Sequence, residues 1–169
     1  MIKQLATLAA VLLTSVAAEA NSESNVISLL EGANIEGNVI ELSVIGSSNS
    51  LALSQTLTSG SLEGNSMTIS IEGNNNGGAG LATFTGVALE SGLLPGELIQ
   101  EGYGNSMVVD VKGTSNLFSF LQSGDHNSLN ASIQGTSNQA AVQQYGQNNH
   151  VSFSQVGNNN SISISQRSF

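Results

Sequence analysis

Apolar and polar residues alternate along the last third of the chain in a pattern that repeats every eleven residues. Each unit has the form G-x-x-N-x-h-x-h-x-Q-x, where h is apolar, as in Gly157, Asn160, Ile162, Ile164 and Gln166. Strict alternation places the Asn, the two apolar side chains and the Gln on one face of a strand. A fixed period of this kind predicts a stacked repeat architecture.

A glycine opens each unit and predicts a turn, because glycine adopts a positive φ at little cost. The expected turn glycines are Gly102, Gly113, Gly124, Gly135, Gly146 and Gly157. One eleven-residue half-unit is then one strand plus a tight arc, and two half-units make a strand–arc–strand coil. The fold class that we predict is all-β, a β-solenoid or cross-β stack of such coils.

Stacking also predicts which side chains form hydrogen-bonded ladders and which form the core. Stacked coils repeat at about 4.7–4.8 Å, so an Asn or Gln can hydrogen-bond to its copies above and below, which satisfies an otherwise costly buried amide. The predicted stacking ladder consists of Asn105, Asn116, Asn127, Asn138, Asn149, Asn160, Gln122, Gln144, Gln155 and Gln166. The predicted core between the strand layers includes Phe118, Phe120, Leu129, Val142, Val151, Phe153, Ile162 and Ile164.

The first half of the chain keeps the unit but loses the period. We divide the chain into an N-terminal segment of residues 21–34 with a candidate degenerate strand, residues 35–76 with irregular repeats, residues 77–99, and residues 100–169 with regular repeats. The spacing from Asn76 to Asn105 is 29 residues, which corresponds to two units plus seven. This stretch contains Pro95, the single proline. We expect residues 77–99 to hold a degenerate repeat and a Gly-rich excursion, either a bulging loop or a hinge.

Residues 1–20 have the features of a secretory signal peptide. Lys3 gives a positive n-region, residues 5–16 form an apolar h-region too short to span a bilayer, and Ala18-Glu19-Ala20 is a cleavage motif. No later stretch is long enough for a membrane helix. The sequence therefore predicts export, with cleavage after Ala20, and a mature chain that is not membrane-embedded.

Charge narrows the possible partners. The formal net charge is −9, with 3 Lys and Arg against 12 Asp and Glu, which excludes the basic surface of a nucleic-acid binder. Residues 21–125 carry eleven acidic residues and Lys112, and residues 126–169 carry only Arg167. We hypothesise that the nearly uncharged C-terminal coils template assembly, and that the acidic first half slows premature assembly.

Candidate chemistry for catalysis or metal binding is sparse. His126 and His150 lie at or beside predicted turns without cysteines or paired carboxylates to complete a metal site, and the chain contains no cysteine. No nucleophile-elbow motif frames any serine. We therefore predict no enzyme activity, no cofactor and no metal.

The repeat resembles that of the curlin family. Residues 100–105 have the form Q-x-G-x-G-N, and residues 122–127, 144–149 and 155–160 have the looser form Q-x-G-x-x-N. The resemblance implies a subunit of curli, the adhesive amyloid fibres of biofilms on Gram-negative bacteria. It also implies a cell-surface location, passage through the curli secretion pore with its accessory proteins, and polymerisation with itself and with the other curlin subunit.

Two alternatives stay open at this stage. The chain resembles both the major fibre subunit and the minor nucleator of the curlin family. A different class of function is a capped, monomeric β-solenoid that binds ice or carbohydrate through a flat polar face, which the outward serine rows of residues 150–165 support.

Overall fold

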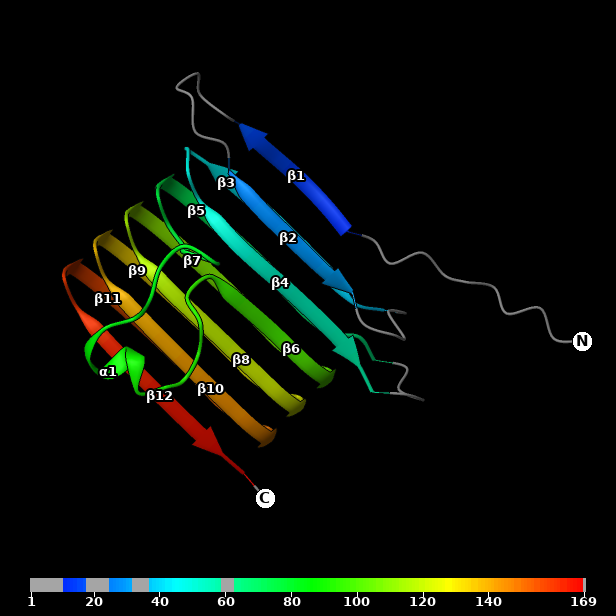
Figure 1. The fold of residues 1–169 in the computed structure, drawn as a ribbon. Coiled ribbons are helices and arrows are strands. Elements are labelled where there is room, and N and C mark those ends of the chain that lie inside the picture. The colour runs from blue at the N-terminus through cyan, green and yellow to red at the C-terminus, as the bar shows by residue number, and fades with distance from the viewer. Residues whose placement is uncertain (1–10, 18–24, 32–36, 59–62, 169) are drawn as a thin grey trace, which may run out of the picture.

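Two parallel β-sheets stacked face to face make up the fold (Figure 1). The computed structural model describes residues 11–17, 25–31, 37–58 and 63–168. Sheet A has the order β1 (Val11–Ala17), β3 (Val39–Ile45), β5 (Ser66–Asn74), β7 (Ser106–Thr114), β9 (Ser128–Thr136) and β11 (His150–Asn158). Sheet B has the order β2 (Val26–Glu31), β4 (Ser50–Leu57), β6 (Glu97–Tyr103), β8 (Leu117–Asp125), β10 (Gln139–Gln147) and β12 (Ser161–Arg167).

The chain crosses between the two sheets after every strand, so each strand pairs with the strand two places later. In the regular region this step is 22 residues: Leu129 pairs with Val151, and Phe118 pairs with Ala140. Equivalent positions of the repeat therefore lie side by side, since the side-chain period of a strand is two. The prediction of an all-β solenoid built from eleven-residue half-units is confirmed.

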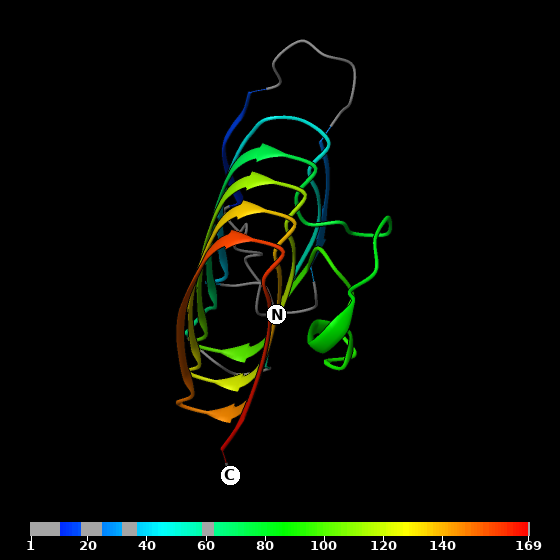
Figure 2. The same cartoon turned by 90° about the vertical axis from the view of Figure 1, so that its left-hand side faces the viewer.

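The hydrophobic core is one continuous stripe between the two sheets, whose strands face each other in Figure 2. It runs from Ile40 in β3 to Val151 in β11. Of the predicted core residues, Phe118, Phe120, Leu129, Val142 and Val151 are buried. Phe153, Ile162 and Ile164 are only partly buried, because they lie in the last two strands, beyond which no described strand stacks. The core of this fold is thus closed along its length and open at its C-terminal end.

Residues 78–95 form an insertion that leaves the stack and packs on the outer face of sheet B (Figure 2). The insertion contains a short helix, α1 (Gly86–Leu89), which the sequence did not predict and which lies against β10 and β12. Phe84, Ala88 and Ala141 of β10 form a second buried apolar cluster. In the resulting contact, Gln139 exchanges hydrogen bonds of 2.7 and 2.6 Å with Thr85.

The expected weak repeat within residues 77–99 is not found in the described structure. Asn76 and Gln100 instead belong to one half-unit, which the insertion interrupts: Gly77 bridges to Leu117 and Gly96 bonds to Phe118, on adjacent positions of β8. The spacing of 29 residues is therefore one unit plus 18 (29 − 11), where we expected two units plus seven. Spacing alone could not separate these two possibilities.

The N-terminal end of sheet A is formed by β1, which pairs with β3. This strand overlaps the predicted h-region of the signal peptide, residues 5–16. The cleavage motif at residues 18–20 falls outside the described residues, and removal of residues 1–20 stays a prediction. If the leader is removed, β3 becomes the edge strand of sheet A.

Candidate functional site: amide ladders and the open C-terminal coil

Two asparagine ladders run through the stack, one at the start of the strands of each sheet. In the ladder beside sheet B, the side-chain amide of Asn138 donates to Asn116 Oδ1 at 3.1 Å, and Asn160 does the same to Asn138. The ladder beside sheet A contains Asn105, Asn127 and Asn149, with steps of 3.0 and 2.9 Å. Both ladders extend into the irregular half of the chain through Asn25, Asn49, Asn76, Asn38 and Asn65.

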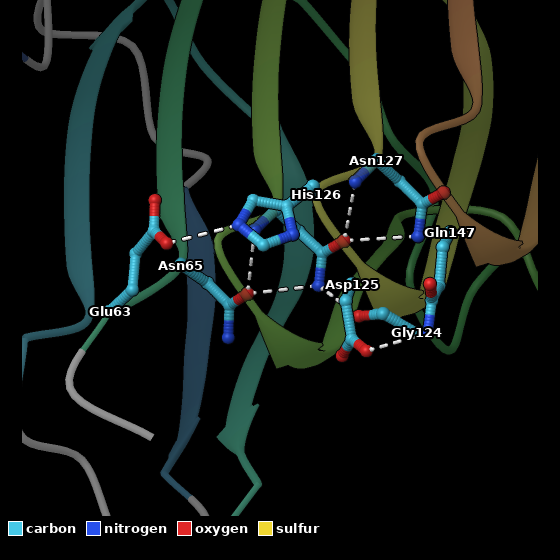
Figure 3. Close-up of polar contacts among 8 residues, drawn as sticks. Glu63, Asn65, Gly124, Asp125, His126, Asn127 and Gln147 are labelled. Atoms are coloured by element: carbon cyan, nitrogen blue, oxygen red, sulfur yellow. Dashed lines mark hydrogen bonds and ion pairs between the residues drawn. The ribbon is translucent and has the colours of Figure 1, made fainter.

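Most ladder asparagines also bond to the arc of the following coil. The amide of Asn127 donates to the carbonyl of Gly146 at 2.9 Å, and its backbone N–H donates to Asn105 Oδ1 at 3.0 Å. Figure 3 shows the same pattern one coil earlier, where the amide between Asn65 and Asn127 belongs to Asn105 and donates to the carbonyl of Gly124 at 2.7 Å. One side chain thus joins its own coil to the coil before it and to the coil after it. A buried amide with all of these bonds satisfied avoids the desolvation penalty of an unpaired polar group.

A glutamine ladder runs through sheet B alone. Each Nε2 donates to the Oε1 of the next glutamine at 2.7–3.1 Å, and each also donates to a backbone carbonyl of the facing strand layer. Its members are Gln55, Gln100, Gln122, Gln144 and Gln166. Gln55 and Gln100 were missing from the predicted set, although Gln100 stands 22 residues before Gln122.

Gln155 is not part of a glutamine ladder, contrary to the prediction. Its register neighbour in sheet A is Ile133, and the preceding position in the same column is Val111. The physical reason is that stacking joins residues 22 apart, so a glutamine needs a glutamine in every second half-unit. Gln155 donates to the carbonyl of Gln139 at 3.3 Å, and its buried Oε1 has no partner among the described residues.

The turn glycines are required by the close approach of successive arcs. A Cβ built on Gly113 would overlap the carbonyl oxygen of Gly135, and one built on Gly135 would overlap that of Gly157. All six predicted turn glycines also have φ values between 95° and 127°. A second left-handed position follows in most arcs, at φ near 57°, and it is occupied by Ser115, His126, Ser137, Asn148 and Asn159. This second position was not predicted.

His126 joins a regular arc to the irregular half of the chain (Figure 3). Its Nε2 lies 3.0 Å from a carboxylate oxygen of Glu63, and its ring meets the Tyr103 ring edge-on at 5.1 Å between centroids. His150 begins β11 and is exposed. No group of three or more His, Asp or Glu residues in the described part of the chain is placed to hold a metal ion.

The C-terminal end of the stack is an open edge. β11 and β12 are the last strands of their sheets, and no described residue donates a hydrogen bond to the side-chain oxygen of Asn149 or Asn160. Between Asn160 and Gln166 there is no acidic residue and no proline. Arg167 lies over the Tyr145 ring at 5.1 Å. Such an edge is a template for another strand, since the features that usually blunt edges are missing.

A parallel two-sheet β-solenoid with internal amide ladders is a structural repeat protein, and the comparison with known families agrees. Residues 135–167 match the family model of the curlin associated repeat. The chain therefore carries the repeat of the curlin family, a family of structural proteins and not of enzymes, and the predicted resemblance is confirmed there. No curated protein matches the chain. No helix among the described residues is long and apolar enough to cross a membrane.

Proposed function

We propose that this chain is a secreted subunit that self-assembles into extracellular amyloid fibres of the curli type, which serve adhesion and the biofilm matrix. The observation that carries the proposal is the open C-terminal coil, where the last strand of each sheet has one edge without a partner among the described strands. Head-to-tail stacking of copies would continue the same parallel pairing that joins coils inside one copy. Its partners would be further copies, the other curlin subunit and the curli secretion apparatus.

The distribution of charge supports different roles for the two halves of the subunit in assembly. The described acidic residues lie no later than Asp125, and the last coil, β11 with β12, contains no acidic residue. In the first half, Lys112 of β7 pairs with Glu72 of β5 at 3.9 Å, and both side chains are more than half exposed. Unpaired surface carboxylates repel one another across two approaching copies, although salt screens them. The last coil, which has no acidic residue, therefore suits templating, and the acidic first half suits the slowing of premature assembly.

A monomeric binder of ice or carbohydrate is less well supported by the two outer faces. The insertion crosses the outer face of sheet B and packs Phe84 and Ala88 against Ala141 there, so this face is not flat. The outer face of sheet A mixes residue types along each column, for example Glu41, Thr68, Val108 and Asn130. A repeated lattice of one residue type is therefore lacking on the described strands.

Thioflavin-T fluorescence of the chain beginning at Asn21 tests the proposed function. We expect a lag phase, a rise, and fibres whose diffraction shows spacings of about 4.7 and 10 Å. A stable monomer without a rise over hours would contradict the proposal and favour the monomeric binder. In the same assay, deletion of residues 146–169 should lengthen the lag phase, because it removes the last coil, which contains no acidic residue. An unchanged lag would refute templating by that coil.

A further inference from the structure

The two ends of the stack carry complementary unpaired amide groups. At the N-terminal end, Asn38 Nδ2 is buried and finds no acceptor among the described residues, and Gln55 Oε1 receives no hydrogen bond from them. At the C-terminal end, the Asn149 side-chain oxygen accepts none, and Gln166 donates only to the carbonyl of His150. Each end therefore has one free donor and one free acceptor that match an acceptor and a donor at the other end, among the described residues.

The polarity of the ladders fixes how a second copy would fit. Asparagine amides donate toward the N-terminal end, as Asn149 does to Asn127, whereas glutamine amides donate toward the C-terminal end, as Gln144 does to Gln166. In a head-to-tail joint, Asn38 of the next copy would donate to Asn149, and Gln166 would donate to Gln55 of the next copy. Both bonds form together only if β3 of the next copy pairs with β11, and β4 of the next copy pairs with β12.

This joint brings two strands into competition for one position. Strands of the two sheets alternate in level along the stack, because the chain changes sheet after every strand. When β3 of the next copy pairs with β11, its β2 arrives at the level that β12 already occupies. If both β12 of the first copy and β2 of the next copy were retained, β2 would pair with β12. Sheet A would then lack one strand between β11 of the first copy and β3 of the next. Parallel pairing in both sheets therefore requires that β2 or β12 gives way.

The sequence of β2 makes it the weaker of the two strands. Glu31 stands in register with Gln55, at the position where the other described strands of sheet B carry glutamine. A glutamate at this register position supplies no amide N–H for a glutamine ladder, whereas Gln166 supplies one. β12 keeps the rest of the contact, because Asn160 supplies the same side-chain oxygen that Asn25 now offers to Asn49.

We propose that β12 of one copy displaces β2 of the next copy from the edge of β4, so that β2 is a built-in cover of the N-terminal growing end. The inference rests on the proposed function, namely head-to-tail stacking of a chain that has lost residues 1–20. β2 pairs the edge of β4 in the free subunit and thereby protects it from premature pairing. Exchange for β12 then extends the glutamine ladder from copy to copy.

Disulfide trapping in fibres distinguishes exchange from simple stacking, and the absence of native cysteine makes the background clean. In the exchanged joint, Ser163 of β12 stands beside Ala52 of the next copy, because both belong to the column that contains Glu97, Ser119 and Ala141. If β2 is retained, Ser163 stands beside Ser28, the register partner of Ala52. Neighbouring strands are about 4.8 Å apart, within the Cα separation that a disulfide bridges.

The trapping experiment uses the chain beginning at Asn21 with either S163C and A52C or S163C and S28C. Fibres are grown under reducing conditions, oxidised, dissolved in denaturant and resolved on a non-reducing gel. We expect a ladder of covalent oligomers from the S163C and A52C pair, and none from the S163C and S28C pair. Covalent oligomers from the S163C and S28C pair would overturn the exchange. Fibres that give no covalent oligomers with either pair would also overturn it.

A locked cover tests the same point kinetically. The disulfide pair S28C and A52C ties β2 to β4 within one copy, and the matched pair S43C and S70C ties β3 to β5, where no exchange is proposed. We expect oxidation to slow elongation by about tenfold or more in the first variant only, with recovery on reduction, since the added strand cannot reach its edge. Equal elongation of the oxidised and reduced first variant would overturn the exchange and leave the proposed function intact. If the reduced chains form no fibres, the proposed function fails and the exchange fails with it.

Discussion

The side-chain amide of Asn138 donates to Asn116 Oδ1 at 3.1 Å, and the two residues are separated by 22 positions in the sequence. This single step spans one full coil, two strands and two arcs. The same amide donates to the carbonyl of Gly157 at 2.7 Å, in the arc that follows. Hydrogen bonds between side-chain amides thereby fix the register in which successive coils stack.

Substitution of Asn138 by alanine should weaken the stack one coil before its C-terminal end. N138A removes bonds to Asn116 and Gly157 and leaves the amide of Asn160 without its acceptor. At about 1 kcal/mol for each bond, the loss should be on the order of 2–4 kcal/mol. Denaturant titration of the assembled material would show a lower midpoint. The control N130A removes an exposed asparagine of β9, and its midpoint should be unchanged; equal shifts would contradict the ladder's role.

Assembly should become dependent on pH when a carboxyl group replaces a ladder glutamine. Q122E places this group where Gln122 is buried between Gln100 and Gln144. Burial raises the pKa of a carboxyl, so the folded state favours its protonated form. Stability is then retained below the unfolded pKa of about 4.3 and is lost as pH rises through the higher folded pKa.

Thioflavin-T kinetics of Q122E at pH 4 and pH 7 measure this dependence, and Q134E, the same change at an exposed position of β9, is the matched control. We expect Q122E to assemble at the lower pH and to assemble poorly at the higher pH. If Q122E and Q134E respond alike to pH, the buried glutamine ladder does not govern assembly.

Two glycine substitutions separate packing inside a copy from packing between copies. Gly135 and Gly157 have similar φ values, 123° and 117°, so the backbone cost of alanine is comparable. A Cβ on Gly135 would overlap the Gly157 carbonyl, whereas one on Gly157 meets only Asn160 Nδ2 at 3.1 Å. G135A should therefore prevent ordered coils, as measured by circular dichroism of the assembled material.

G157A should leave coils within one copy in place and slow the addition of copies. In the head-to-tail joint, the arc at Gly46 of the next copy would lie against Gly157, as successive arcs do inside one copy. Seeded elongation rates give the comparison, with wild-type seeds and equal protein concentrations. A G157A chain that elongates at the wild-type rate would argue against this joint.

The insertion should be released from sheet B by a charge beneath it. Ala141 of β10 is fully buried against Phe84 and Ala88 of the insertion, so A141E would bury a carboxylate without a partner. We expect rapid chymotryptic cleavage after Phe84, detected by mass spectrometry, with assembly retained because the inner face of β10 is untouched. S152E, on the exposed outer face of β11, should leave Phe84 protected. Protection of Phe84 in A141E would contradict the packing described above.

Much of the fold could be predicted from single units of the repeat. The alternation around Asn116, Phe118, Phe120 and Gln122 gave a correct strand and a correct buried face, because side chains alternate along any strand. The arcs were predicted from their glycines. The second left-handed position, at residues such as Ser137, was missed because serine and asparagine in a turn do not by themselves indicate a positive φ.

Other features depend on which residues meet across a coil. Gln155 looks like a ladder residue in its own unit, yet its neighbour at a distance of 22 is Ile133. The insertion could not be predicted as an interruption of one unit, because a sequence spacing does not show that Asn76 and Gln100 share a strand position. Its burial of Phe84 against Ala141 joins residues that no local pattern connects.

The sequence by itself determined that this protein is a stack: an eleven-residue period with alternating side chains allows only strands joined by arcs, whatever the surroundings. The tertiary structure alone decided which side chains share a column, with glutamines aligned in sheet B and the aliphatic residues Val111 and Ile133 in the equivalent column of sheet A. It also decided which polar groups stay unpaired at each end, such as Asn38 Nδ2. The physical reason is that hydrogen bonds in a parallel stack join residues one full coil apart, so their partners are set by the winding of the chain and not by its local order.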